Sequence, residues 1–536
     1  MLKICFSKTG KPTLAYNNNF LHSKYDPEKE ANRFIKESLH DEHPQVVILL
    51  GAGIGYLSSE LDKVLPRSKL ILVYYSEIIF RHCNERPIIS WHPGTNLSFI
   101  NFLKSNISDI DLEGLKIIEW SPSALLFPLI SKKVNSEINL LVKEYRGNIV
   151  TTNAFGKTWI RNSFSNFISI DSIMEGQIAR PDNPVVITAS GPSLENSIEY
   201  IKNIRNKINL WSLPSSIPFI LGNNIKPDLI ILTDSSYYSI CHIQEIADQN
   251  IPVVMPLSGA RGVYNISNMI FLISQPAFYE QIIYRKAGLS PPLIPPKGTV
   301  AATALELALE LTNKEIIICG LDLCYSDIKS HVRTNSFNNL LKKDANRMEP
   351  YYSRIFGRAV MHAPVKCNSI RTSIALNTYS NWFSSINYNN KKIQKRLFRF
   401  MPSLCNINGL NNLDTKSFTE LIQSYPESNN KIRYKLNENY PDKLIRKNIV
   451  LDIIERWKSI INNAEITARK DINLIVLDSD FLELAYFIDL AGLTSLKKNF
   501  RNNKQSVNKS FAKLISKLNI FTGSLYNKIK KANQNA

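Results

Sequence analysis

Short runs of apolar residues recur along the first part of the chain, each followed by a polar turn and a helical pattern. The run 46–50 leads into Gly51, Gly53 and Gly55, then into a helix pattern with one apolar face, and then into a second run at 69–75. Fully apolar runs are typical of strands buried on both faces of a parallel sheet. This segment predicts a Rossmann-like unit, and its glycine loop fits either a structural turn or nucleotide binding.

A second set of apolar runs begins after about residue 150. The strand candidates are 184–189, 227–234, 251–258 and 315–320, and helical patterns such as 300–312 separate most of them. Strands that alternate with helices favour a doubly wound parallel sheet. In such sheets ligands bind beyond the carboxyl ends of the strands, so we expect the site there.

From about residue 396 the pattern changes, because Asn, Lys and Ser dominate and apolar residues recur at helical spacing, as in 445–467. The predicted fold class is α/β, with two Rossmann-like doubly wound domains followed by a mostly helical C-terminal region. The expected domains are an N-terminal Rossmann-like domain at 1–150, a central catalytic domain at 151–395, and a helical region with a basic tail at 396–536.

The composition is that of a globular protein, with 44% hydrophobic and 21% charged residues among 536. The formal net charge of +19 favours acidic partners. Much of the excess lies in the segment 501–536, which holds Lys and Arg but no acidic residue. This segment is either a solvated helix end or a docking surface for an acidic partner or a membrane. No nucleic-acid recognition motif accompanies the charge, so we expect no nucleic-acid partner.

The seven cysteines are dispersed and form no C-x-x-C motif, so the sequence predicts neither a disulfide framework nor a metal site. The N-terminal residues lack the apolar stretch of a signal peptide. No window approaches the ~20 apolar residues of a membrane span. We therefore expect a cytoplasmic protein without a transmembrane segment.

Polar residues follow the first strand of the central region. Ser190, Gly191, Pro192 and Ser193 come directly after the run 184–189 and precede a helical pattern. Glycine allows tight backbone geometry, and proline suits the first turn of a helix. The exposed N–H groups and the helix dipole then favour an anion, so this turn predicts a phosphate site.

Two further strand ends carry candidate ligand-binding residues. Asp234 ends the run 227–234, where it is either a helix cap or a contact to a ribose or substrate hydroxyl. Lys297, Gly298 and Thr299 precede the long Ala/Leu helix pattern at 300–312. A second helix N-terminus at the same edge, with a lysine beside it, also suits a nucleotide phosphate.

The strand candidate 315–320 is followed by a polar segment with Asp322, Tyr325, Asp327, His331 and Arg333. A histidine titrates near neutral pH and can accept a proton from a hydroxyl. Because His331 lies in a loop at the expected active edge, we predict that it is the catalytic base, with Asp327 and Asp234 as the next bases to test.

Several of these motifs together resemble one family. "ASGPSL", "IKPDLIILTD", "PPKGTVAATALELA" and "IICGLDLCYSDIKSH" are similar to the motility associated factor (Maf) flagellin glycosyltransferases, whose central domain is MptE-like. The last two motifs also resemble bacterial sialyltransferases that use CMP-sialic acid. Upstream, "LLGAGIGY" resembles the N-terminal Rossmann-like domain of Maf proteins, and "WIRNSFSNF" (159–167) resembles the segment that enters their central domain.

The resemblance implies transfer of a nonulosonic acid, such as pseudaminic or legionaminic acid, from its CMP donor to Ser or Thr of flagellin. It implies a site without a metal or further cofactor, in which Asp322 shapes the pocket and Tyr325 stabilises the departing phosphate. By the same resemblance, CMP would be bound by Ser190, Gly191, Pro192, Ser193, Gly298 and Thr299.

Two other functions remain open. An MptE-like pterin diphosphokinase would transfer diphosphate from ATP and would need Mg²⁺, for which Asp234, Asp322 and Asp327 could be recruited. A non-catalytic chaperone that binds flagellin belongs to a different class. Binding of CMP, of Mg–ATP or of neither would distinguish the three.

Overall fold

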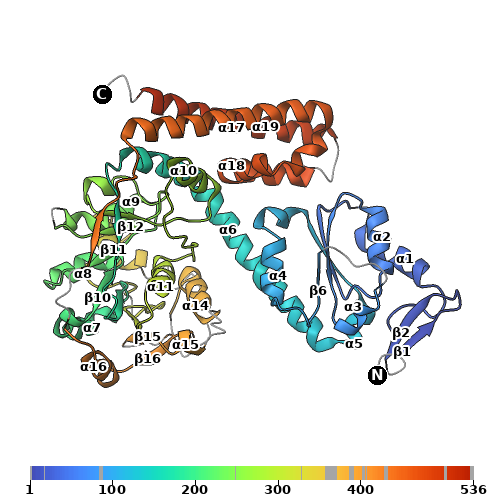
Figure 1. Ribbon diagram of the computed structural model, residues 1–536, viewed down its shortest axis with the longest axis horizontal. Helices are drawn as coiled ribbons and strands as arrows, with labels where there is room; N and C mark the ends of the chain where they lie inside the picture. Colours follow the sequence, from blue (N-terminus) through green and yellow to red (C-terminus); the bar gives the residue numbers. More distant parts are fainter. Residues whose placement is uncertain are drawn as a thin grey trace. The chain divides into compact units, whose positions relative to one another are not determined.

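The structure is a computed structural model (Figure 1). It describes residues 3–16, 19–40, 42–83, 89–247, 249–326, 329–355, 371–385, 391–400, 405, 407, 409–427, 432–499 and 504–531. The chain divides into two compact units, 1–156 with 457–524 and 157–456 with 525–536. Asp327 lies outside the described residues.

A four-stranded parallel sheet in the order β6–β5–β4–β7 forms the centre of the first unit. Alternate residues of β4 enter two different cores, since Val47 and Leu49 pack on one face and Val46 and Ile48 on the other. The strands are β4 (Val46–Leu50), β5 (Lys69–Val73), β6 (Ser90–Trp91) and β7 (Leu115–Glu119). The flanking helices are α1 (Pro27–Leu39), α2 (Tyr56–Val64), α3 (Glu77–Arg81), α4 (Phe99–Asn106), η1 (Asp109–Gly114) and α5 (Ser121–Leu126).

A small antiparallel sheet precedes this domain. It consists of β1 (Lys3–Phe6), β2 (Pro12–Tyr16) and β3 (Asn19–Phe20).

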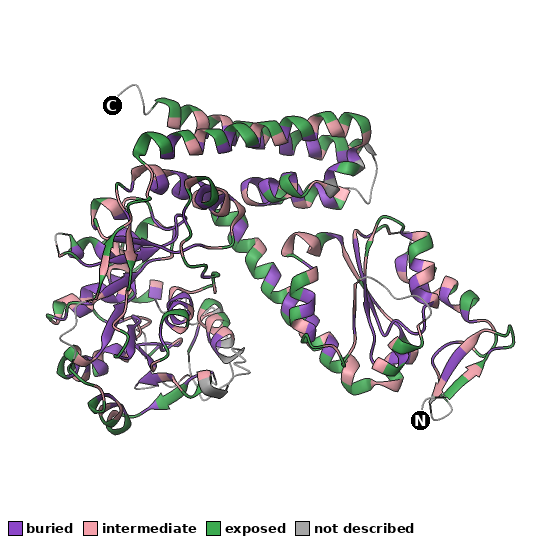
Figure 2. Cartoon of the chain, in the orientation of Figure 1, coloured by how far each residue is buried: buried purple, intermediate pink, exposed green. Residues whose placement is uncertain are grey.

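An eight-stranded sheet forms the centre of the second unit, in the order β13–β12–β11–β10–β9–β14–β15–β16. Every neighbouring pair in it is parallel. The strands are β9 (Val185–Thr188), β10 (Asn209–Ser212), β11 (Leu229–Ile231), β12 (Val253–Met255), β13 (Ile270–Leu272), β14 (Ile316–Cys319), β15 (Leu397–Phe400) and β16 (Asn411–Leu413). Figure 2 shows strands of this sheet in purple, as buried elements.

Helices connect these strands and pack on both faces of the sheet, as the two cores around Ile187 and Val186 show. They are α7 (Leu194–Asn203), η2 (Arg205–Lys207), η3 (Pro214–Ser216), α8 (Ile217–Gly222), α9 (Tyr237–Ile243), η4 (Gln244–Ile246), η5 (Val263–Asn265), α10 (Phe278–Ala287), α11 (Val300–Leu311), α12 (Ser336–Lys343), α14 (Ile374–Ser385), α15 (Lys391–Gln394) and α16 (Thr415–Gln423). A separate antiparallel pair joins β8 (Met174–Gly176) to β17 (Tyr434–Leu436).

Both predicted domain boundaries differ from the structure. The boundary at 150 falls inside α6, a single helix from Pro128 to Ser169. The boundary at 395 falls before β15 and β16, which extend the central sheet, so the helical region does not begin at 396. The two strands escaped notice because β15 contains Arg399 and β16 begins with two asparagines.

The C-terminal helices are α17 (Lys443–Asp471), α18 (Ser479–Asn499) and α19 (Lys504–Lys531), with η6 (Ile472–Leu477) between the first two. α19 buries Phe511, Leu514 and Leu518 in the first unit. Lys517 of α19 pairs with Asp489 at 2.9 Å. Within the basic segment, α19 therefore contributes its apolar face to the core, which neither alternative from the sequence foresaw, while residues 501–503 and 532–536 lie outside the described residues.

The fold class predicted from the sequence is confirmed, with two parallel α/β domains and a helical C-terminal region. Among the described helices, none combines the length and apolarity that a membrane span requires.

Candidate functional site

The strand order of the second unit reverses next to β9. From β9 the chain builds β10 to β13 on one side, and then returns to place β14 on the other side. In open α/β sheets a ligand crevice forms beyond the carboxyl ends of the strands at such a switch point. The predicted turn at 190–193 follows β9, and Asp322 and Tyr325 follow β14, so the chain brings these segments to one edge.

The turn after β9 lies against the loop after β14. The N–H of Gly191 donates to the carbonyl of Gly320 at 2.8 Å. A Cβ atom on residue 191 would lie 2.4 Å from that carbonyl oxygen and 2.4 Å from Oδ2 of Asp322. This close approach requires glycine at 191, whether or not a ligand binds.

The N-terminus of α7 already holds a carboxylate. Oδ2 of Asp322 accepts a hydrogen bond from the backbone N–H of Ser193 at 2.7 Å, and the Asp322 side chain is buried. A carboxylate is the group that a helix N-terminus favours. The Ser193 N–H, which the sequence predicted as a phosphate donor, is thus bonded within the protein.

Asp322 also interacts with a buried cation. Burial lowers the pKa of Arg399 on β15, and the nearby Asp322 carboxylate opposes this effect. Nη1 of Arg399 donates to the carbonyl of Cys405 at 2.7 Å. The carboxylate therefore links the first turn of α7 to β15 of the sheet.

Backbone and side-chain hydrogen bonds fix the loop that carries His331 over the turn after β9. The N–H of Val332 donates to the carbonyl of Ser190 at 2.9 Å. Nδ2 of Asn335 donates to the carbonyl of Ser215 at 3.0 Å, and the Ser215 hydroxyl donates to that of Ser190 at 2.8 Å. Pro192 is buried in the same turn.

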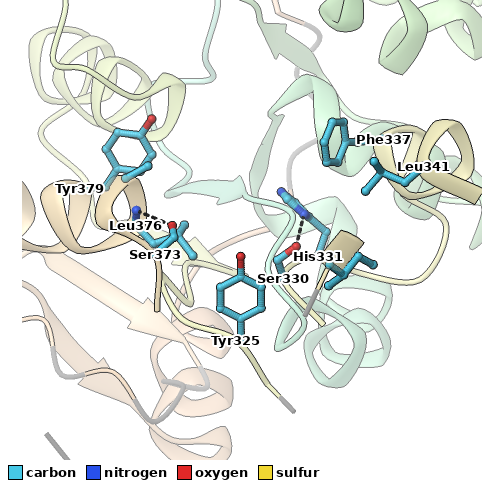
Figure 3. Close-up of a pocket in the computed structure, with 10 residues that line it drawn as sticks. Tyr325, Ser330, His331, Phe337, Leu341, Ser373, Leu376 and Tyr379 are labelled. Carbon is cyan, nitrogen blue, oxygen red and sulfur yellow. Dashed lines mark hydrogen bonds between the residues drawn. The ribbon is translucent and has the colours of Figure 1, made fainter. Parts of the chain in front are cut away.

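A cavity of about 430 Å³ opens beyond β14. Tyr325, Ser330 and His331 from the loop contribute its polar wall, and α12 and α14 contribute most of the remainder (Figure 3). Figure 3 shows the Tyr325 hydroxyl pointing into this space. The other lining residues are Phe337, Leu341, Ile355, Ser373, Ala375, Leu376 and Tyr379.

His331 is neutral at physiological pH. Burial, which is the larger cause, and the electrostatic effect of His242 together lower the pKa of its imidazole to about 4. Nδ1 lies 2.9 Å from the hydroxyl oxygen of Ser330. If Nδ1–H donates to Ser330, the lone pair is on Nε2, which can then accept a proton.

Asp234 lies after β11, but the N-cap residue of α9 is Ser236, so Asp234 is not itself the helix cap that the sequence left open. Its two carboxylate oxygens accept hydrogen bonds from the N–H and the hydroxyl of Ser236, both at 2.9 Å, at the start of α9. The carboxylate also interacts electrostatically with His242 of α9 and with Tyr379, which lines the cavity. Contact of Asp234 with a ribose or substrate stays a prediction.

Residues 297–299 reach the same edge of the sheet but do not line the cavity. α11 packs against β9 and β14 and runs back toward their amino ends, so it begins at the carboxyl edge. The Thr299 hydroxyl caps α11 by accepting from the N–H of Ala302 at 3.0 Å. Lys297 pairs with Glu306 at 3.5 Å. Gly298 has a φ of +77° and open space where a Cβ would be.

The sequence and the fold were compared with known proteins. Residues 157–328 match the family model described as 6-hydroxymethylpterin diphosphokinase MptE-like. The whole chain matches the structure of MAf glycosyltransferase from Magnetospirillum magneticum AMB-1 with a TM-score of 0.63 and 12% identity, covering 100% of this chain and 92% of that one. The chain has the fold of a Maf glycosyltransferase. The predicted resemblance is thus confirmed for the fold and for the MptE-like domain.

Curated relatives match part of this chain. Two uncharacterized proteins of Treponema pallidum (strain Nichols) are 25% identical over 303 residues and 22% identical over 363 residues. These matches cover 56% and 63% of this chain. The chain spans only 63% and 62% of the length of these two relatives.

The glycine loop of the Maf-like N-terminal domain is filled by a side chain. A Cβ on Gly53 would lie 2.3 Å from Nε2 of His22, and the N–H of Ile54 donates to that nitrogen at 3.3 Å. His22 is buried and stacks on Trp120 at 5.6 Å. Burial lowers the pKa of His22. The described contacts favour the structural alternative for this loop over nucleotide binding.

The motif at the entry to the MptE-like domain holds the strand-end loops. Nδ2 of Asn162 donates to the carbonyls of Ser235 and Ser258 at 3.0 and 3.3 Å. Nδ2 of Asn166 donates to the carbonyls of Leu257 and Gly259 at 2.8 and 3.0 Å. Both asparagines are buried in α6, so "WIRNSFSNF" fixes loops at the carboxyl edge of the sheet.

Proposed function

We propose that the chain is a glycosyltransferase that moves a nonulosonic acid from a CMP-activated donor to Ser or Thr hydroxyls of flagellin. One observation carries this proposal: in a chain with the fold of a Maf glycosyltransferase, Tyr325 and His331 line one cavity beside the strand-order switch point. The donor, the acceptor and a cytoplasmic location are parts of the proposal that rest on motif resemblance.

The proposed chemistry is a direct displacement at the anomeric carbon. The acceptor oxygen bonds to this carbon while the bond to the CMP phosphate oxygen breaks, so the anomeric centre inverts. Nε2 of His331 takes the hydroxyl proton as the new bond forms. Tyr325 donates a hydrogen bond to the phosphate oxygen, which leaves with the electron pair.

The donor phosphate needs a different anchor from the one that the turn at 190–193 suggests. Asp322 occupies the Ser193 N–H and would repel an anion there. The start of α11 offers the positive end of a twelve-residue helix and open space at Gly298, and Lys297 beside it is paired with Glu306. We therefore propose that the phosphate lies nearer Gly298, with the Ser190 segment holding another part of the nucleotide.

Replacing His331 tests the mechanism. His331→Ala should lower the rate of transfer to flagellin by roughly 10²–10⁴-fold, the usual contribution of a general base, while CMP affinity changes little. His43→Ala, in an exposed position of the first unit, is the matched control. Transfer by His331→Ala at a rate near that of the wild type would remove His331 from the mechanism.

A second candidate function has its own support. The family model that matches residues 157–328 is described as a 6-hydroxymethylpterin diphosphokinase, which favours diphosphate transfer from Mg–ATP. Isothermal titration separates the possibilities. CMP binding supports the glycosyltransferase, Mg–ATP binding supports the kinase, and binding of neither leaves the flagellin-binding chaperone.

A further inference from the structure

A row of aromatic rings leads from His331 to the protein surface. The ring of Phe337, in the first turn of α12, lies 6.4 Å from the imidazole of His331 and lines the cavity. The ring of Tyr238, in α9, lies 6.2 Å from that of Phe337 in an edge-to-face arrangement, with 82° between the planes. Exposure increases along the row, since Phe337 is half-buried and 53% of Tyr238 is exposed. We call the rings of Phe337 and Tyr238 the aromatic ledge.

Hydrogen bonds fix the two helices that carry the aromatic ledge. Oδ1 of Asn335 accepts from the N–H of Phe337 at 2.9 Å and caps α12, while Nδ2 of the same side chain donates to the carbonyl of Ser215. α9 follows Ser236, whose N–H and hydroxyl donate to Asp234, and it packs against α12. Rings that are held in place before a ligand arrives lose little conformational entropy on binding, so an exposed ring here suits a contact that contributes to affinity.

We infer that the aromatic ledge binds the acceptor polypeptide beside the Ser or Thr that receives the sugar, with Tyr238 as the main contact. The inference rests on the proposed function, in which His331 accepts the proton of that hydroxyl. A tyrosine offers a large, rigid contact area that is apolar over its ring and polar at its hydroxyl, and tyrosines are enriched among the residues that dominate protein interfaces. The aromatic ledge therefore suits an apolar side chain of the acceptor.

The direction of the displacement assigns the aromatic ledge to the acceptor and not to the donor. The attacking oxygen and the leaving phosphate oxygen lie on opposite sides of the anomeric carbon, and in the proposed reaction His331 contacts the first and Tyr325 the second. Figure 3 shows His331 between Tyr325 and Phe337, so the aromatic ledge continues from His331 on the side away from Tyr325. The cytidine is joined to the sugar through the phosphate, so it belongs on the side of Tyr325.

The distances between the rings limit where the contact falls in the acceptor. Placed end to end, the separations of 6.4 and 6.2 Å span at most about 13 Å, which is the length of about four residues of extended chain. The acceptor residue that contacts Tyr238 should therefore lie within about four positions of the modified Ser or Thr.

Steady-state kinetics of Tyr238→Ala separate acceptor binding from chemistry. With purified unglycosylated flagellin as the acceptor and a saturating CMP-activated nonulosonic acid, the KM for flagellin should rise roughly 5- to 30-fold, the usual effect of truncating a dominant aromatic contact. The kcat should change little, because the base and the contact to the leaving group remain. Tyr238→Phe keeps the ring and should recover most of the affinity for flagellin. Tyr25→Ala, at a 65% exposed tyrosine of the first unit, is the control.

Titration with CMP measures donor binding in parallel. Tyr238→Ala should bind CMP as the wild type does, and a fall in CMP affinity would place the aromatic ledge on the donor side and overturn the inference. An unchanged KM for flagellin in a folded Tyr238→Ala protein would also overturn it and leave the proposed function standing. Absence of both CMP binding and transfer in the wild type would overturn the proposed function, and the role of the aromatic ledge with it.

Discussion

Removing the charge of Asp322 should destabilise the MptE-like domain far more than removing a charge from its surface. Only 4% of Asp322 is exposed, and its carboxylate accepts the Ser193 N–H at 2.7 Å. The nearby Arg399 is 1% exposed. Asp322→Asn keeps an acceptor for Ser193 but leaves a buried guanidinium without the nearby anion.

The two contributions can be separated by two variants. Loss of one partner of a buried charge pair costs about 3 kcal/mol or more of unfolding free energy, so Asp322→Asn should lose about that much. Asp322→Ala also removes the acceptor at the N-terminus of α7, which adds about 1 kcal/mol. Asp452→Asn is the control, because Asp452 forms an exposed ion pair with Lys286, and such pairs contribute about 1 kcal/mol or less.

Urea unfolding of the full chain, followed by tryptophan fluorescence, measures these differences. Trp211 is fully buried on β10, so comparison with Trp211→Phe identifies the transition of this domain. Unfolding of Asp322→Asn at the same urea concentration as the wild type would refute the reasoning. It would mean that the burial of the Arg399 guanidinium does not depend on this carboxylate.

Three more predictions concern buried side chains. Burial raises the pKa of Glu280 from 4.5 to about 7, so its contribution to the free energy of unfolding should be full below about pH 4.5 and should decline as the pH rises through 7, by about 3 kcal/mol in total. Thermal unfolding across this range should therefore depend less on pH in Glu280→Gln than in the wild type. An equal pH dependence in the two proteins would contradict the assignment. Gly53→Ala should lower the stability of the first unit in differential scanning calorimetry, because the new Cβ collides with His22 and φ is +70°. Gly10→Ala is the control, since Gly10 has a similar φ but open space around it. Equal losses of stability in the two variants would rule out the collision. Deletion of 504–531 should expose buried positions of α18 such as Phe481, whose ring lies 6.0 Å from that of Phe511 in α19, and should increase binding of a hydrophobic dye. An unchanged signal would mean that α19 is dispensable for the core.

The sequence was sufficient for the strands whose pattern is local. The runs at 184–189, 227–234, 251–258 and 315–320 contain β9, β11, β12 and β14, because a strand buried on both faces must be apolar throughout. β15 was missed because Arg399 interrupts its apolar run. The charge is tolerated there because Asp322 lies nearby, and this proximity depends on the tertiary fold.

The candidate site was predictable in its place and less so in its contacts. Chain order located Ser190, Asp322 and His331 at one sheet edge, because the carboxyl ends of parallel strands lie together. The bond between Asp322 and Ser193 joins residues 129 positions apart, so no local pattern could indicate it. Tyr238 gave no signal either, since an exposed tyrosine in a short helix becomes informative only when its neighbours in space are known.

The asparagine pair of α6 affects how relatives of this chain should be recognised. Asn162 and Asn166 hold four loop carbonyls through hydrogen bonds that a shorter or apolar side chain could not make. The motif "WIRNSFSNF" therefore reports that a chain has the same loop geometry, and not that it performs the same reaction. A search profile weighted on this motif would therefore collect chains that share this loop geometry, whatever reaction each of them performs.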